Sequence, residues 1–185
     1  MNDSQAAPEI KWQGKYITVR QQGTWEYVSR SRGIRAAVIL AVDDEGEDGP
    51  CLILVEQYRV PLGKRCLELP AGLVGDDDSP AGEPAAQAAA RELEEETGYR
   101  ARSMVDLGDF YSSPGMVSES FWLFRAQGLT RVHEGGGVEG EDITVHRVPV
   151  ARIADYVAER RAEGMAIDVK LLIALGAGMM KPAKD

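Results

Sequence analysis

Four glutamates fall within five consecutive positions of this chain, Glu92 and Glu94 to Glu96, and their spacing suggests metal-dependent chemistry. In a helix, Glu92, Glu95 and Glu96 are three and four residues apart and share one face. Like charges placed in this way repel by roughly 0.2–0.5 kcal/mol per pair on an exposed helix. A divalent cation removes that cost, and carboxylate oxygens are the ligands that Mg²⁺ or Mn²⁺ prefers. The alternative is a solvated acidic helix, as we interpret Glu94.

The residues around this cluster predict the helix that must hold it. We expect a helix from about Glu83 to Thr97, because Pro84 suits a first turn, alanines favour the interior and Gly98 ends it. A short strand at 66–69 precedes it. The segment Pro70-Ala71-Gly72 and the polar loop Gly75–Gly82 lie between that strand and the helix.

Alternating and β-branched segments predict strands on both sides of this helix. They lie at residues 15–20, 24–29, 34–42, 51–57, 103–111, 120–126 and 143–148. Two further helices are expected at the end of the chain, at residues 151–162 and about 168–179. This order predicts an α/β or α+β sandwich, in which a sheet packs between helices.

Composition limits the possible partners. With 185 residues the chain fits one domain with a short N-terminal extension. A net charge of −9 argues against nucleic acid, whose binding is driven by cationic side chains. No apolar run is long enough for a membrane span, and residues 1–9 lack the features of a signal peptide. Cys51 and Cys66 lie in apolar segments, which suits reduced thiols in a cytoplasmic protein.

Residues Arg91 to Tyr99 resemble the signature box of the Nudix hydrolases. That box runs Gly, five residues, Glu, seven residues, then Arg-Glu-apolar-x-Glu-Glu-x-Gly-apolar. Glu83 stands at the expected distance before Arg91. Gly72 departs from the pattern because ten residues, not five, separate it from Glu83, and we interpret this as an insertion within Gly75–Gly82.

A second group of segments resembles the ADP-ribose pyrophosphatase branch of this family. Val55 to Arg59 leads into Glu68 to Gly72, Pro114 lies sixteen residues after Gly98, and residues 139–143 resemble an acidic loop that supplies a catalytic glutamate. The resemblance implies an α/β/α sandwich with a mixed sheet. We therefore expect an N-terminal β extension at 1–32, the Nudix domain at 33–180 and a frayed tail at 181–185.

The resemblance implies hydrolysis of ADP-ribose to AMP and ribose 5-phosphate by water, assisted by two or three Mg²⁺ or Mn²⁺ ions. GDP-mannose, another nucleotide sugar or a dinucleotide is the alternative substrate. A non-catalytic nucleotide-sensing domain is a different hypothesis, but such domains usually lose the box glutamates that this chain keeps.

The catalytic candidates divide into metal ligands and a base. The resemblance implies that Glu92, Glu95, Glu96 and the backbone carbonyl of Ala71 hold the metal. Glu139 is the predicted base, with Glu141 or Asp142 as alternatives, and the upstream glycines 135–137 would let that loop swing over the substrate. Arg91 lies one turn before Glu95, so it either orients this catalytic carboxylate or forms a surface ion pair.

The substrate-binding candidates come from three other segments. Arg59 has a planar donor fork that suits a phosphate, although a surface position is the alternative. Pro114 and Gly115 form a turn that would wall the terminal ribose, with Met116 and Glu119 at its border. Trp25 packs in a core or interface by default, and stacking on a purine is the functional alternative. The resemblance also implies a homodimer in which the N-terminal strands reach the other subunit's pocket.

Overall fold

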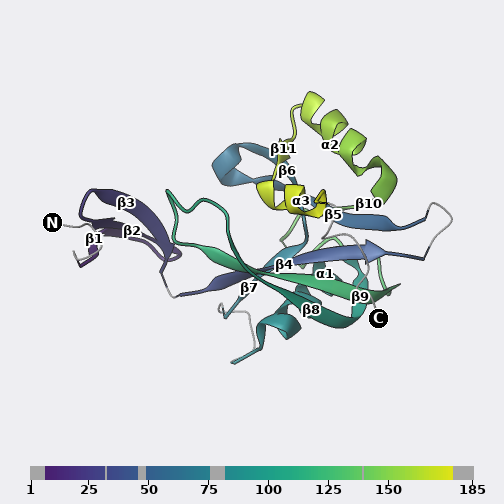
Figure 1. Ribbon diagram of the computed structural model, residues 1–185, viewed down its shortest axis with the longest axis horizontal. Helices are drawn as coiled ribbons and strands as arrows, with labels where there is room; N and C mark the ends of the chain where they lie inside the picture. The colour runs from purple at the N-terminus through teal and green to yellow at the C-terminus, as the bar shows by residue number, and fades with distance from the viewer. Residues whose placement is uncertain (1–6, 32, 46–48, 76–81, 139, 177–185) are drawn as a thin grey trace.

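The computed structural model describes residues 7–31, 33–45, 49–75, 82–138 and 140–176. This part of the chain contains a large sheet, a small sheet and three α-helices (Figure 1). The small sheet consists of β1 (Glu9–Gln13), β2 (Ile17–Gln22) and β3 (Trp25–Arg30). The strands of the large sheet are β4 (Arg35–Asp43), β5 (Cys51–Arg59), β6 (Lys64–Glu68), β7 (Ala71–Val74), β8 (Tyr99–Tyr111), β9 (Ser120–Arg131), β10 (Thr144–Pro149) and β11 (Ala166–Ile167). The helices are α1 (Ala85–Thr97), α2 (Ile153–Ala162) and α3 (Val169–Ala174), with 3₁₀ turns η2 (Val60–Leu62) and η3 (Val150–Arg152).

The large sheet is mixed, as predicted. Its strand order is β11-β6-β5-β4-β9-β8, while β10 also pairs with β5 and β7 with β4. β4 runs parallel to β9 and β11 parallel to β6, whereas the other pairs are antiparallel. The expected hairpin between residues 34–42 and 51–57 is present as β4 and β5.

Side chains alternate along the central strand β4, so the sheet has one hydrophobic core on each face. Ile39 and its neighbours of the same parity pack with Leu93 of α1. Leu40 faces the opposite way and packs with Ile153 of α2 and Leu171 of α3. Helices therefore cover both faces, which confirms the predicted sandwich. No helix in the described part of the chain has both the length and the apolar character that crossing a bilayer requires.

The N-terminal extension forms its own antiparallel sheet, set to one side of the large sheet (Figure 1). It contains one strand more than predicted, because β1 precedes the two expected strands. Val28 of β3 donates its N–H to the carbonyl of Met116 at 2.9 Å, and the N–H of Ser118 bonds to the carbonyl of Val28 at 2.9 Å. These bonds attach the extension to the segment that contains Pro114. The predicted boundary at residue 32 and the tail at 181–185 lie outside the described residues.

Candidate active site

Helix α1 begins and ends close to the predicted positions. It starts after Pro84, and Gly98 ends it with a φ of 74°, a left-handed conformation that glycine adopts without strain. Ala89 and Leu93 are fully buried against the sheet. The glutamates at 92, 95 and 96 occupy the remaining face and line a cavity.

That cavity has a volume of about 640 Å³ and lies among β4 to β7, α1 and the loop before β10. Its lining is rich in charge, with six glutamates and four cationic side chains. They are Glu68, Glu92, Glu95, Glu96, Glu119, Glu141, Arg30, Arg59, Arg91 and Lys170. The predicted residues Ala71 and Gly72 line it as well, so the structure gathers most of the predicted site at one place.

The box arginine contacts three carboxylates. Arg91 donates from Nη1 to Oε2 of Glu95 at 2.9 Å, pairs with Oε1 of Glu92 at 3.0 Å, and bonds to both oxygens of Glu83 at 3.3 Å. Its side chain is 27% exposed and Glu83 only 8%. Arg91 therefore contacts Glu95 one turn further along α1, as the helical spacing predicts. Glu83 acts as an anchor for Arg91.

Two of the helix carboxyls are poorly solvated. Burial raises the pKa of Glu96 to about 8, and the charges of Glu92 and Glu141 raise it further while the Ala71 N–H lowers it. Burial likewise raises the pKa of Glu92 to about 7, with Arg91 opposing and Glu95 adding to the rise. Both shifts have the same main cause, because burial disfavours the charged carboxylate, and the neighbouring acids of the cavity add to it.

The segment before α1 approaches the helix closely. The N–H of Ala71 donates to Oε2 of Glu96 at 3.0 Å. A Cβ on Gly72 would lie 1.9 Å from Cδ of Glu92, so only glycine leaves room for that carboxylate. The insertion that separates Gly72 from Glu83 includes residues 76–81, which lie outside the described part of the chain.

The loop before β10 is attached to the C-terminal end of α1. The N–H groups of Gly136 and Gly137 bond to the carbonyls of Glu96 and Glu95 at 2.9 and 3.1 Å. A Cβ on Gly135 would lie 2.5 Å from the carbonyl carbon of Thr97. In this structure Gly135 therefore permits close packing against α1. The swing of this loop over a substrate stays a prediction.

Of the two acidic loop residues that the structure describes, Glu141 lines the cavity. Glu141 and Val138 form two hydrogen bonds, both 3.0 Å long. The N–H of Glu141 donates to the carbonyl of Val138, and the N–H of Val138 donates to Oε2 of Glu141. Asp142 points elsewhere, since its side chain is 84% exposed and pairs with Arg65. The predicted base Glu139 lies outside the described residues.

Arg59 lines the cavity but has an acidic partner that was not predicted. Its Nε and Nη2 bond to the two oxygens of Glu68 at 2.6 and 2.8 Å. Glu68 is 4% exposed and Arg59 is 41% exposed in their side chains. The pairing holds the guanidinium plane at the cavity wall.

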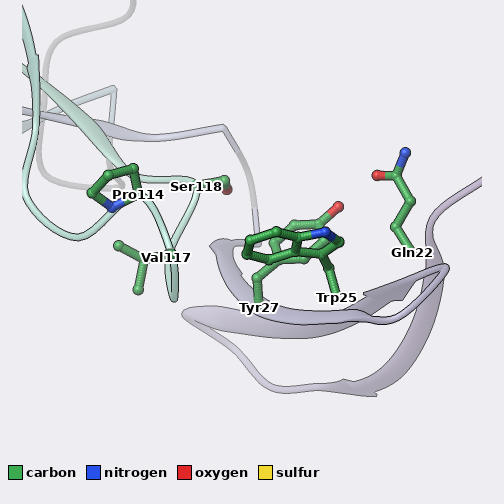
Figure 2. A pocket seen from close by; sticks show the side chains of 7 residues that line it. Gln22, Trp25, Tyr27, Pro114, Val117 and Ser118 are labelled. Atoms are coloured by element: carbon green, nitrogen blue, oxygen red, sulfur yellow. The ribbon is translucent and has the colours of Figure 1, made fainter. Parts of the chain in front are cut away.

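The remaining predicted residues gather around a second, smaller pocket of about 320 Å³ between β3 and the segment after β8 (Figure 2). Trp25 and Tyr27 rise from the same face of β3, and Pro114 and Val117 lie across from them. Gly115 also lines this pocket, whereas Met116 is 65% exposed and contributes its backbone carbonyl to β3.

Glu119 stands between the two spaces and lines the larger cavity. Its Oε1 accepts from Nε of Arg30 at 2.6 Å. Arg30 belongs to β3 in the N-terminal extension, so this ion pair connects the extension with the glutamate cavity.

Comparison with known proteins agrees with this architecture. The NUDIX domain matches residues 32–166, which is most of the chain. The chain belongs to the Nudix family. An ADP-ribose pyrophosphatase of Bacillus subtilis is 40% identical over 99 residues, 54% of this chain and 49% of that protein. A GDP-mannose pyrophosphatase of Cronobacter sakazakii is 34% identical over 153 residues, 78% of this chain and 72% of that protein.

The crystal structure of an ADP compounds hydrolase has the same fold, with a TM-score of 0.62 and 24% identity over 82% of this chain and 80% of that one. This Nudix chain spans about half the length of several curated relatives that it matches, such as the B. subtilis protein.

The side chains of this Nudix site suit a hard cation in their chemistry, although they are held by other partners in this structure. Arg91 engages Glu92 and Glu95, and the Ala71 N–H engages Glu96. Within the described ranges no three acidic, histidine or cysteine side chains converge closely enough as they stand to enclose an ion. The raised pKa values of Glu92 and Glu96 show that their negative charges are poorly compensated in the metal-free cavity, and Gly72 leaves room beside Glu92. The donor set therefore fits Mg²⁺ or Mn²⁺ once these contacts are exchanged.

Sequence reasoning missed Arg30, Gln57, Lys170 and the role of Glu68 in this Nudix cavity. Lys170 comes from the C-terminal helix α3 and Arg30 from the N-terminal extension. Neither belongs to a recognisable motif. Glu68 belongs to the segment Glu68 to Gly72 named above, but β5 and β6 pair Glu68 with Val55 and Arg59 with Lys64, so strand pairing alone does not indicate its contact with Arg59.

Proposed function

We propose that this chain hydrolyses the pyrophosphate bond of ADP-ribose, giving AMP and ribose 5-phosphate, with Mg²⁺ or Mn²⁺ bound by Glu92, Glu95, Glu96 and the Ala71 carbonyl. One observation carries the proposal: three glutamates of one helix and a fourth from a separate loop, Glu141, face the same cavity. Similarity to an ADP-ribose pyrophosphatase supports the choice of substrate.

The residues that line the cavity have different roles in the proposed reaction. Divalent cations held by Glu92, Glu95, Glu96 and the Ala71 carbonyl would neutralise the diphosphate, lower the pKa of a water and stabilise the leaving phosphate. We assign the general base to Glu141, because its carboxylate reaches the cavity from a different segment than the three metal-binding acids and so stays available for the proton of the attacking water. Arg91 keeps Glu95 in place by their 2.9 Å bond.

Substrate recognition uses the cations of the cavity and the aromatic pocket beside it. Because Nε and Nη2 of Arg59 already bond to Glu68, Nη1 is the nitrogen that would bind a substrate phosphate. Trp25 and Tyr27 offer flat apolar surfaces to a nucleobase, and Pro114 lies across from them (Figure 2). Gly115 also lines this pocket.

A GDP-linked sugar is the second candidate substrate. The match to a GDP-mannose pyrophosphatase covers more of this chain than the match to the B. subtilis ADP-ribose pyrophosphatase. Stacking alone accepts any base, because every base has an aromatic face. The comparison of kcat/KM for the two substrates decides between them.

The test is a panel of ADP-ribose, GDP-mannose and NADH, each with Mg²⁺, with Mn²⁺ and with chelator, followed by chromatography of the products. We expect AMP from ADP-ribose with metal and none with chelator. Glu94→Gln serves as the matched control, because Glu94 lies on the same helix and pairs with Arg100 away from the cavity. Absence of turnover for the whole panel with either metal would refute the proposal.

We also propose that the protein is a homodimer in the cytoplasm. The N-terminal sheet exposes large apolar side chains, including Trp12 at 55% and Tyr16 at 64% exposure, and a second copy of the chain would cover them. Cys51 and Cys66 are buried and unbridged, which suits a reducing compartment. Sedimentation at micromolar concentration tests the dimer, and a single monomeric species would refute it.

A further inference from the structure

Arg65 is a charged residue outside the cavity whose contacts converge on the loop that carries Glu141. It lies on β6, and the described cavity lining does not include it. Its Nη1 donates to Oδ2 of Asp142 at 2.8 Å, and its Nη2 reaches the carbonyl of Asp142 at 3.4 Å and Oγ1 of Thr144 at 3.2 Å. One guanidinium thus holds both the side chain and the backbone of the residue next to Glu141.

The guanidinium of Arg65 is itself held from the opposite side. Its Nε bonds to Oε1 of Glu56, and Nη2 bonds to the carbonyl of Glu56 at 3.1 Å. The other carboxylate oxygen of Glu56 contacts Nε2 of His146 at 2.9 Å, and Nδ1 of His146 contacts the hydroxyl of Tyr156 at 3.0 Å. Glu56 is 12% exposed and His146 is 20% exposed. A chain of polar contacts therefore extends from α2 through the sheet to the loop.

This arrangement places an anchor on each side of Glu141. Upstream, Gly136 and Gly137 bond to carbonyls of α1, the helix that presents the three glutamates. Downstream, Arg65 holds Asp142 and Thr144 against β5 and β6. Because a general base must stay close to the water that it deprotonates, small displacements of the loop reduce the rate steeply.

We propose that Arg65 is a positioning residue for the reaction: by clamping Asp142 and Thr144 it holds the Glu141 carboxylate at the glutamate cavity. The statement rests on the proposed function in naming Glu141 as the base. Arg65 does not line the cavity, so we expect its loss to lower kcat and to leave KM unchanged. Asp142, which the sequence offered as a possible base, is in this proposal the residue through which Arg65 holds the loop.

Kinetics of four proteins test this role: wild type, Arg65→Ala, Asp142→Ala and Arg100→Ala. Asp142→Ala removes the same ion pair from the other partner. Because the Asp142 side chain is 84% exposed, we expect this variant to fold normally. Arg100→Ala is the matched control, because Arg100 forms an equally forked pair with Glu94 on an outer surface. We expect Arg65→Ala to lower kcat about tenfold with KM unchanged, Asp142→Ala to lower it less, and Arg100→Ala to leave it unchanged.

The same substitutions in a Glu141→Gln background separate positioning from any other role. Without the carboxylate there is no base to hold, so we expect Arg65→Ala to change the residual rate by less than about twofold. An equal loss in both backgrounds would overturn the proposal, because Arg65 would then act independently of Glu141.

Amide hydrogen exchange gives an answer that does not depend on turnover. In metal-free protein, Arg65→Ala should speed exchange in residues 140–144, where the Glu141 N–H bonds to Val138, and leave α1 unchanged. Unchanged exchange in this segment would overturn the clamp even if the enzyme is active. If the wild type turns over no substrate but exchange is faster in the variant, the clamp stands and the proposed reaction fails.

Discussion

The glutamate cavity and the aromatic pocket differ in how the chain builds them. The cavity takes its central carboxylates from one helix, α1, within five consecutive positions. The pocket joins Trp25 and Tyr27 of β3 to Pro114, nearly ninety residues later in the sequence. The cavity is lined by polar and charged side chains, whereas the pocket is lined by aromatic rings and a proline (Figure 2). We infer that the chemistry is encoded locally, whereas substrate recognition depends on how distant segments meet.

The largest effect is expected at the centre of the cavity. Glu96→Gln keeps the size of the side chain but removes a buried charge that would hold the cation, so kcat should fall by roughly 10³-fold or more. Circular dichroism should show that the fold is retained. Near-normal activity would show that the α1 glutamates are not needed for the reaction. The contrast between a catalytic glutamate cavity and a binding aromatic pocket would then be wrong.

Removal of the base should have the next largest effect. Glu141→Gln should lower kcat by roughly 10²-fold or more, which is the usual contribution of a positioned base. The matched comparison is Glu139→Gln, measured under the same conditions. If Glu139→Gln is the more damaging change, then the first prediction from the sequence was right and the cavity contact of Glu141 is not the catalytic one.

A change in the aromatic pocket should act on binding alone. Trp25→Ala removes a stacking surface, and we expect KM to rise roughly tenfold while kcat stays near the wild-type value. Tyr58→Ala is the control, because Tyr58 is 53% exposed, close to the 55% of Trp25, and lies outside the pocket. A fall in kcat as large as the rise in KM would show that the pocket and the cavity are not separable.

The smallest effect concerns stability and pH. The pKa values of Glu92 and Glu96, raised to about 7 and about 8 by burial, mean that the folded protein holds protons that the unfolded chain releases above pH 4.5. Without metal, the melting temperature should therefore fall as pH rises from about 5 to about 8. Mg²⁺ should reverse the loss most strongly near pH 8, where protons no longer compete for the carboxylates. A melting temperature that is independent of pH in metal-free protein would contradict the pKa shifts.

The fold was largely predictable because its patterns are local. Alternation in 34–42 and 51–57 and the alanine-rich segment before Gly98 specify β4, β5 and α1 through side-chain period and propensity. β1 was missed, since all five of its residues are exposed and it lacks a buried face to create a pattern. The strands β8 and β9 are longer than predicted because they continue as a paired hairpin whose polar ends carry little periodicity.

The site was predictable only in part. The acids of α1 and the pairing of Arg91 with Glu95 follow from helical spacing. The partner of Arg59 depends on strand register, and the role of the 135–137 glycines depends on how closely α1 approaches them. Composition suggested a hinge at these glycines, and it could not show that the N–H groups of Gly136 and Gly137 bond to carbonyls of α1.

Helical geometry converts the order of residues 91–98 directly into a face of carboxylates, so this acidic face was determined by the sequence alone. Which loop acid reaches that face, which arginine holds the loop, and which aromatic residues wall the neighbouring pocket were decided by tertiary structure. The physical reason is that these relations depend on strand pairing and close packing between segments that lie far apart in the chain. No local pattern specifies such distances.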